Sequence, residues 1–233
     1  MRTQLMIMLI VSAVVLVVVG GLAGLVVWLG WLAGLAVGFG VLLLLVGVYV
    51  WIVKPWHMRW GTTDAENLQS MPGDELIPGA GQATRAISIS ARPEEVWPWL
   101  VQLGYGKAGW YSYDWIDNDF RPSADRIVPE YQDLTVGEKI LMMPGMGFVV
   151  RSIDEPNSIV SVLEDGSTSW CLALYPEGDS TRLVSRWRPK FEKTPATFFM
   201  TMLSEPGTFI MEQKMLRTIR DRIESVGVTS RAA

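Results

Sequence analysis

The longest apolar stretch of the chain lies at its start, where no charged residue occurs between Leu5 and Val53. A helix crosses the hydrocarbon core of a bilayer, which is about 30 Å thick, with about 20 residues, and this stretch is more than twice that long. A cleaved signal peptide does not fit, because its apolar core has only about 7–15 residues. The pattern therefore predicts a transmembrane hairpin within residues 1–54, with helices at about 5–29 and 31–53.

Aromatic and small residues indicate the geometry of this hairpin. Trp28 and Trp31 flank Gly30, and tryptophan favours membrane–water interfaces, so we expect the turn at Gly30. Glycines at four-residue spacing lie on both sides of it, at Gly20, Gly24, Gly34 and Gly38. Such spacing lets helix backbones approach closely, so we expect the two helices to pack through these glycines. The alternative is that they join two copies of the chain as a homo-oligomer.

The charges around the hairpin predict its orientation. Arg2 precedes the first helix, Lys54 and Arg59 follow the second, and the turn carries no charge. Basic residues stay on the cytoplasmic side of a membrane. We therefore expect a two-pass protein of the cell membrane, with both termini and the following domain in the cytoplasm and the lipid bilayer as one partner.

The pattern changes after the apolar stretch. Residues 55–82 are rich in glycine, proline and acidic residues and have no sustained period, which predicts a linker or an extended wrap. Residues 85–90 alternate as a strand does, and apolar residues at helical spacing follow Pro93. Short apolar runs separated by turn signals over residues 139–188 predict an antiparallel meander. The arginines of its last strand, residues 181–188, predict one solvent-exposed face.

A long helix is predicted at the end of the chain. Its charged residues, Glu212 among them, fall mostly off an apolar stripe of Phe209, Leu216, Ile219, Ile223 and Val226. Gly227 ends this helix, so we expect a domain over residues 83–228 and a disordered tail over residues 229–233. Strands followed by one long helix give an α+β fold.

Composition excludes several kinds of site. The chain has one cysteine, Cys171, and one histidine, His57, so it can form neither an internal disulfide nor a Cys/His zinc cluster. We expect no metal and no cofactor. The 24 acidic residues outnumber the 20 basic ones, which argues against nucleic acid as a partner.

Residues 104–109, Gly-Tyr-Gly-Lys-Ala-Gly, match the glycine pattern of dinucleotide-binding folds. That pattern requires a strand before the first glycine and a helix that opens at the last one. Here a helix is expected before Gly104, and an aromatic run follows Gly109. We therefore interpret the glycines as a helix end and two flexible positions, and expect no nucleotide site.

Three stretches of the domain, PEEVWPWLVQLGYGKAGWYSYDWIDN, SADRIVPEYQDLTVGEKI and FIMEQKMLRTIRDRIE, carry a resemblance to a known family. They resemble membrane-anchored members of the SRPBCC superfamily, in its polyketide cyclase/dehydrase and lipid-transport-like group. The resemblance covers about residues 60–226. It implies a START-type helix-grip fold, in which a curved antiparallel sheet surrounds a long C-terminal helix with an apolar cavity between them. The superfamily contains lipid carriers, hormone receptors, cyclases and oxygenase subunits, so it does not fix an activity.

The first functional hypothesis is membrane-tethered binding, transport or sensing of a hydrophobic small molecule or lipid. A cavity of about 300–1,000 Å³, the usual size of such a site, is expected beside residues 110–115. Phe198 and Phe199 are expected at its mouth. The candidate ligand-binding residues are aromatic side chains, methionines and a few polar groups: Trp110, Tyr111, Tyr113, Asp114, Trp115, Arg126, Trp170, Trp187, Met211 and Met215.

Two other functions stay open at this stage. An enzyme of the cyclase or hydratase type would use carboxylates and tyrosines of the cavity as acids and bases. The carboxylates available to it are Asp114, Asp117, Asp119, Asp125 and Glu130, of which Asp117 and Asp119 are expected at the surface. A protein-interaction module would instead present an outer surface and leave the cavity filled.

Overall fold

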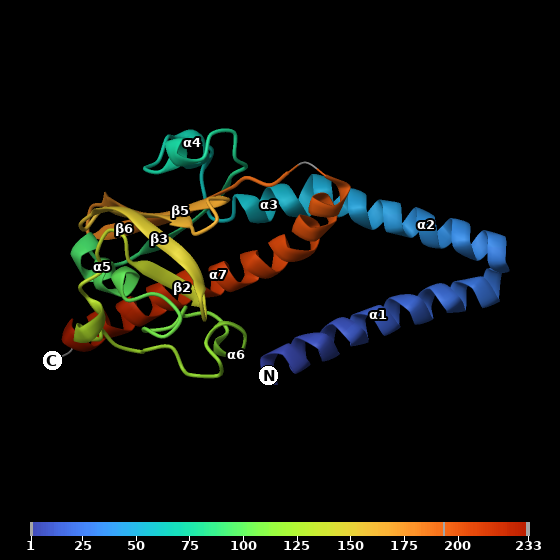
Figure 1. Ribbon diagram of the computed structural model, residues 1–233, viewed down its shortest axis with the longest axis horizontal. Coiled ribbons are helices and arrows are strands. Elements are labelled where there is room, and N and C mark those ends of the chain that lie inside the picture. The colour runs from blue at the N-terminus through green and yellow to red at the C-terminus, as the bar shows by residue number, and fades with distance from the viewer. Residues whose placement is uncertain (1, 193, 232–233) are drawn as a thin grey trace. The chain divides into compact units, whose positions relative to one another are not determined.

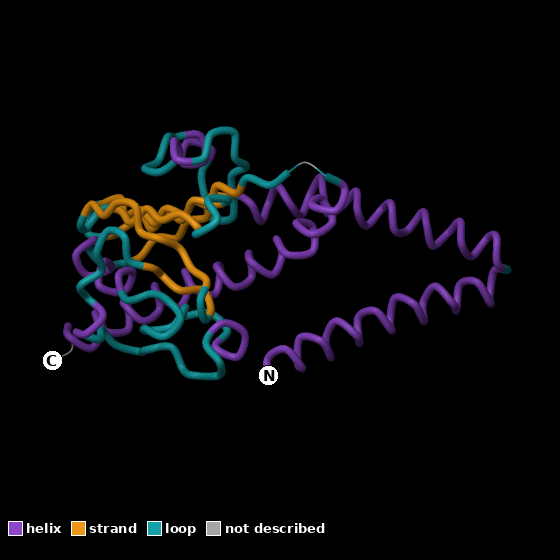
Figure 2. The backbone as a smooth tube through the Cα atoms, in the orientation of Figure 1, coloured by secondary structure: helices purple, strands orange, loops and turns teal. Residues whose placement is uncertain are grey.

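The computed structural model describes residues 2–192 and 194–231, apart from the side chains of residues 2–11, 14, 15, 25 and 226–231. The chain divides into two compact units, Met1–Trp56 and His57–Ala233 (Figure 1). The first unit is helical, and the second combines a sheet with helices (Figure 2).

The first unit contains the two helices expected from the apolar stretch. α1 covers Arg2–Leu29 and α2 covers Trp31–Val48. Gly30 lies between them with φ of 80°, a left-handed conformation that favours glycine, and the chain reverses there. α2 continues through a π-helical turn, η1 (Tyr49–Val53), into α3 (Lys54–Met58).

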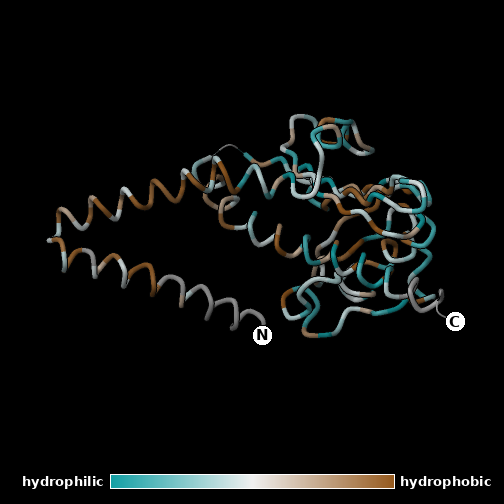
Figure 3. The backbone as a smooth tube through the Cα atoms, turned by 180° about the vertical axis from the view of Figure 1, so that it is seen from behind, coloured by the Kyte–Doolittle hydropathy of each residue, from teal (hydrophilic) through white to brown (hydrophobic). Residues whose placement is uncertain are grey.

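One helix of the described residues is long and apolar enough to cross a membrane, Trp31–Met58. Figure 3 shows the hydrophobic colour along α2. In α1 the apolar stretch with described side chains is shorter, Leu16–Leu29. The structure therefore supports one apolar helix as a candidate membrane anchor.

The glycines of the hairpin do not behave alike. Gly34 and Gly38 are buried, and a Cβ atom added at Gly38 would lie 2.6 Å from Cδ2 of Leu22 on α1. Gly20 and Gly24 are exposed, and nothing lies within 4 Å of a Cβ built on either. Gly38 of α2 thus packs against a larger side chain of α1, and the expected pairing of glycines from both helices is absent at Gly20 and Gly24.

A six-stranded antiparallel sheet forms the centre of the second unit, in the order β1-β6-β5-β4-β3-β2. Strands β2 to β6 follow one another as the predicted meander, and β1 joins the sheet beside β6. The strands are β1 (Ala83–Ile89), β2 (Lys139–Met143), β3 (Met146–Asp154), β4 (Ser158–Leu163), β5 (Thr168–Glu177) and β6 (Ser180–Pro189).

The long helix α7 (Pro195–Arg231) packs on the inner face of this curved sheet together with α5 (Pro93–Val101) (Figure 1). The apolar stripe is confirmed at Phe209, Leu216, Ile219 and Ile223, which are all buried; its last predicted member, Val226, lies outside the described side chains. The helix is longer than expected at both ends. It absorbs the apolar segment that starts at Pro195, and it continues past Gly227 into the predicted tail, whose residues 232 and 233 lie outside the described residues. The α+β helix-grip architecture is confirmed.

Within the predicted linker, His57 and Trp60 lie against Phe209 of α7, and residues 61–82 cover the outer face of the sheet. They contain the short helices α4 (Asp64–Leu68) and η2 (Asp74–Leu76), and Met71 packs against Val160, Cys171 and Val184 of the sheet. Arg186 of β6 lies beneath them, 1% exposed, and pairs with Asp74 at 2.8 Å. The prediction of a solvent-exposed face on this strand is therefore wrong at Arg186, because the preceding segment folds back over it.

Candidate ligand-binding site

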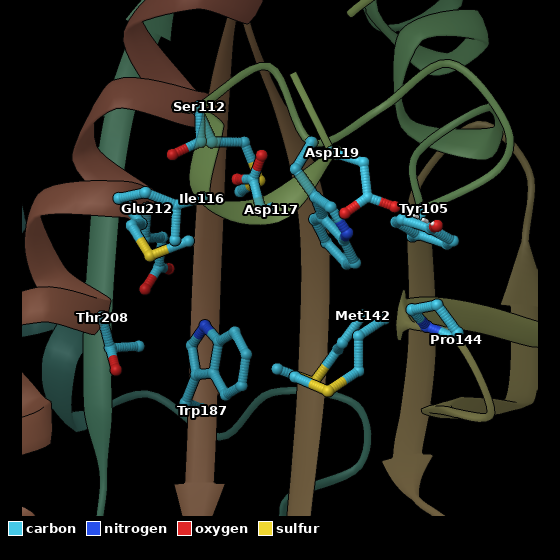
Figure 4. A pocket seen from close by; sticks show the side chains of 14 residues that line it. Tyr105, Ser112, Ile116, Asp117, Asp119, Met142, Pro144, Trp187, Thr208 and Glu212 are labelled. Atoms are coloured by element: carbon cyan, nitrogen blue, oxygen red, sulfur yellow. Dashed lines mark hydrogen bonds between the residues drawn. The ribbon is translucent and has the colours of Figure 1, made fainter. Parts of the chain in front are cut away.

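A cavity of about 350 Å³ lies between α7 and the inner face of the sheet (Figure 4). Three parts of the chain line it: α7, strands β2 and β6 with the turn after β2, and the loop that connects α5 to β2. That loop contains the short helix α6 (Asp114–Asp117). The apolar wall consists mainly of aromatic and methionine side chains: Tyr105, Trp110, Ile116, Met142, Met143, Pro144, Trp187, Met211 and Met215.

Residues 104–109, which match the glycine pattern of dinucleotide-binding folds, form one end of this loop. Gly104 and Gly109 exchange two backbone hydrogen bonds, each of 3.1 Å, and so close residues 105–108 into a turn. Gly109 has φ of 83°, and a Cβ there would lie 2.4 Å from Oγ of Ser123. Only glycine fits this position. The turn brings Trp110 against the sheet, where its indole N–H donates to the carbonyl oxygen of Leu141 over 3.2 Å.

Tyr111 and Asp114 hold the next part of the loop in place. Asp114 accepts hydrogen bonds from the backbone N–H and the hydroxyl of Ser123, at 3.1 and 2.5 Å. The hydroxyl of Tyr111 accepts a hydrogen bond of 2.6 Å from the side chain of Gln102, and the guanidinium of Arg222 lies 4.7 Å from the centre of its ring. Burial raises the pKa of Tyr111 to about 12. Both residues therefore fix the conformation of the loop through contacts outside the cavity.

The structure brings together four of the ten candidate residues. Trp110, Trp187, Met211 and Met215 line the cavity. Trp170 lies behind the wall, with its ring stacked on Trp187 at 5.2 Å. The other residues that do not line this cavity are Tyr111, Tyr113, Asp114, Trp115 and Arg126, and the mouth expected at Phe198 and Phe199 is likewise not part of its lining.

Sequence reasoning placed two acidic residues differently. Glu212 was expected off the apolar stripe of α7, yet it is 5% exposed and lines the cavity. Its spacing of three residues from both Phe209 and Met215 is the signal that places it on the buried face. Asp117 was expected at the surface, but both of its carboxylate oxygens are buried at the cavity wall.

The charge of Glu212 is compensated. It forms an ion pair with Arg85 of β1, and both side chains are 3% exposed. Its second oxygen accepts a hydrogen bond of 2.6 Å from the hydroxyl of Ser185. Arg85 also donates to the backbone carbonyl of His57 over 3.0 Å and lies 5.3 Å from the ring centre of Phe209. This carboxylate is thus a structural part of the cavity wall.

Asp117 lies in a different environment. Within the part of the chain that the structure describes, neither of its oxygens has a hydrogen-bond partner of normal geometry, and the same holds for Oγ of Ser112 and Nε1 of Trp187. Burial, and secondly the charge of Asp114, raise the pKa of Asp117 to about 7, although the nearby Ser112 hydroxyl acts in the opposite direction. All three side chains line the same cavity.

The described residues contain no cluster of three or more His, Cys, Asp or Glu side chains that could hold a metal ion.

No family model and no curated protein matches this sequence. Several solved structures are similar to it. A Polyketide_cyc-like protein from Corynebacterium glutamicum is 14% identical, with a TM-score of 0.39 over 65% of this chain and 96% of that one. The KanY protein is 12% identical, with a TM-score of 0.43 over 63% and 99% of the two chains. An AHSA1-like protein from Aeromonas hydrophila is 17% identical, with a TM-score of 0.35 over 62% and 94%.

Proposed function

We propose that this protein binds a hydrophobic small molecule or lipid in the cavity under α7 while its N-terminal helices hold it at a membrane. One observation carries the proposal: the cavity of about 350 Å³ has a predominantly apolar wall. Small-molecule sites are of about this size, about 300–1,000 Å³, and are mostly apolar with a few polar groups.

The composition of the wall suits a ligand of variable shape. Four methionines, Met142, Met143, Met211 and Met215, line the cavity together with Trp110 and Trp187. Methionine side chains are unbranched and polarizable, so they adapt to different apolar surfaces. A lipid chain or another flexible hydrocarbon fits such a wall better than a rigid polar molecule does.

The membrane tether supports the same proposal. The helix Trp31–Met58 ends where the second unit begins, at His57. A domain held at the bilayer has access to molecules that dissolve in it. We propose that α1 also crosses, so that both termini and the domain are cytoplasmic, as the positions of Arg2, Lys54 and Arg59 favour.

An acid–base enzyme is the second candidate, and one observation favours it. Asp117 faces the cavity with a pKa raised to about 7 by burial, and a carboxyl group with such a pKa can both donate and accept a proton near neutral pH. The other carboxylates around the cavity are engaged. Asp119 accepts a hydrogen bond from Tyr105, and Glu212 is paired with Arg85.

The binding proposal is tested by asking what the protein carries. The full chain is purified in lipid nanodiscs, and its extract is compared by mass spectrometry with that of empty nanodiscs. We expect an enriched apolar compound that is lost in Thr208→Trp, because Thr208 lines the cavity. Ile210→Trp is the matched control, since Ile210 is 49% exposed and does not line it. Equal enrichment in both variants would contradict binding in this cavity.

A further inference from the structure

The polar atoms of the cavity indicate which chemical group a ligand must present. Three of them have no hydrogen-bond partner of normal geometry within the described residues: the carboxylate of Asp117, the hydroxyl of Ser112, which lies close enough to lower the pKa of Asp117, and the indole N–H of Trp187. Figure 4 shows the indole nitrogen of Trp187 directed toward the end of the cavity that holds Ser112 and Asp117. A buried polar group without a partner costs free energy, so a ligand that supplies the missing hydrogen bonds would be bound more tightly.

The requirements of these atoms are specific. The indole of Trp187 can only donate, so it needs an acceptor. The ionised form of Asp117 can only accept, so it needs a donor. A hydroxyl group meets both needs, because it donates one hydrogen bond and accepts others. An ammonium group cannot accept from the indole, and a hydrocarbon satisfies neither atom.

Charge argues against an anionic head group. Among the described residues no lysine or arginine lines the cavity, whereas Asp117, Asp119 and Glu212 do. The cation that compensates Glu212, Arg85, is fully engaged by that ion pair. A ligand carboxylate or phosphate would therefore meet a site without a free positive partner.

We propose that the cavity takes an uncharged amphiphile whose hydroxyl group is bound by Asp117, Ser112 and Trp187, while its hydrocarbon body lies against the methionine and aromatic wall. This assignment rests on the proposed binding function and adds the ligand class to it. The protonation behaviour of Asp117 supports it. Because burial raises the pKa of Asp117 to about 7, the carboxyl group exists in both forms near neutral pH, and a hydroxyl can pair with either.

The test compares ligands that differ only in their head group. The full chain in lipid nanodiscs is labelled by an alkyl diazirine without a polar head, and decanol, decane, decanoate and decylamine compete at equal membrane concentrations. We expect decanol to displace the label at about a tenfold lower concentration than decane, the effect of a hydrogen bond to a buried charged group. Decanoate and decylamine should compete less well than decanol.

Variants then assign the preference to residues. Asp117→Leu and Trp187→Phe should reduce the tenfold preference for decanol over decane to about twofold or less. Asp119→Asn is the matched control, because Asp119 lines the same cavity but accepts a hydrogen bond of 2.5 Å from Tyr105; it should keep the full preference. Ser112→Ala is the smallest change at this end of the cavity, and it should also reduce the preference for decanol over decane. It keeps the test possible if Asp117→Leu or Trp187→Phe prevents folding.

Each outcome separates the two proposals. Equal competition by decanol and decane, or a preference that persists in both Asp117→Leu and Ser112→Ala, overturns the hydroxyl site and leaves apolar binding intact. Stronger competition by decanoate or decylamine also overturns it, in favour of a charged head group. Failure of the alkyl diazirine to label the cavity of the unchanged protein overturns the binding function and this inference with it.

Discussion

The hydroxyl of Ser185, on β6, donates a hydrogen bond of 2.6 Å to the carboxylate of Glu212, on α7. The same hydroxyl accepts the indole N–H of Trp170 over 2.9 Å, and Glu212 is also paired with Arg85 of β1. A continuous line of polar contacts therefore joins three strands, β5, β6 and β1, to the long helix at the wall of the cavity. Directional hydrogen bonds of this kind hold α7 in register over the sheet more specifically than apolar contacts do.

Breaking this line on one side should destabilise the domain strongly. Glu212→Leu or Arg85→Met leaves one buried charge without a partner, and we expect each to lower the free energy of unfolding by about 3–5 kcal/mol. The double variant should lose less than the sum of the two, because no isolated charge remains. Urea unfolding of the full chain in nanodiscs, followed by tryptophan fluorescence, measures these values.

The exposed pair of Lys139 and Glu164 is a suitable control, since the two side chains are 49% and 34% exposed. Lys139→Met should change the free energy of unfolding by about 1 kcal/mol or less. If the losses of the two single variants at Arg85 and Glu212 simply add, the pair is not coupled and the line has no structural role.

The loop that presents Ser112 and Asp117 depends on Gly109. Gly109→Ala places a methyl group 2.4 Å from Oγ of Ser123 at φ of 83°, and it displaces the residue that holds Asp114. Gly106→Ala has a similar φ of 79° but nothing within 4 Å of the new Cβ. Both variants carry the strain of a left-handed alanine, about 1 kcal/mol, and only the first adds a clash of about 1–3 kcal/mol. Equal melting temperatures for the two variants would exclude a close contact at Gly109.

Asp117 should make stability depend on pH. Its pKa is raised to about 7, mainly by burial, so the folded state binds this proton more tightly than the unfolded chain. The free energy of unfolding therefore falls as the pH rises from about 4 to about 7 and then levels off. Asp117→Asn should be more stable than the unchanged protein by about 1–2 kcal/mol at about pH 8, after allowance for solvent screening, and this gap should close toward about pH 4.

Urea unfolding at several values between about pH 4 and about pH 8 measures the difference in free energy of unfolding between Asp117→Asn and the unchanged protein. Ser112→Ala retains Asp117 and should extend the fall in stability to higher pH, because the Ser112 hydroxyl lowers the pKa of Asp117. A gap between Asp117→Asn and the unchanged protein that is the same at both ends of the range would mean that Asp117 is hydrated in the folded state.

The sequence predicts well what regular periodicity determines. Alternation along β5 and β6 places Trp170 and Trp187 on the same face, and the two residues are direct partners in the sheet. The stripe of α7 predicts the burial of Leu216 and Ile219. In both cases the regular repeat of the strand or helix determines which way each side chain points, so the sequence alone predicts which residues face the core.

The site itself depends on features without a period. Tyr111 has φ of 55°, a left-handed conformation that is uncommon outside glycine and that redirects the chain. Tyr111 therefore lies in the core, while Ser112 after it lines the cavity. Asp117 lies at the wall of a cavity that α7, about 90 residues later, helps to form. No sequence pattern within the loop predicts this tertiary arrangement. For that reason Asp117 was expected at the surface.

Packing within the hairpin should depend on Gly38 and not on Gly24. A side chain at Gly38 would meet Leu22, whereas nothing lies within 4 Å of a Cβ at Gly24. Gly38→Leu should therefore separate α1 from α2, and Gly24→Leu should not. Spin labels at Val18 and Leu42, which are 55% and 56% exposed, report the distance between the helices in nanodiscs. Equal distance distributions in the two variants would argue that the glycines instead serve contacts between copies of the chain.

The number of membrane passes determines on which side each end of the chain lies. If α1 and the helix Trp31–Met58 both cross, a reporter at either terminus lies in the cytoplasm, where Arg2, Lys54 and Arg59 are retained. If only Trp31–Met58 crosses, the two termini lie on opposite sides. We expect a phosphatase that is active only outside the cytoplasm to be inactive at both ends, and a fluorescent protein that folds only in the cytoplasm to fluoresce at both. Phosphatase activity at the N-terminus alone would reduce the hairpin to a single anchor with the domain still cytoplasmic. Activity at the C-terminus would place the cavity outside the cytoplasm and reverse the predicted orientation.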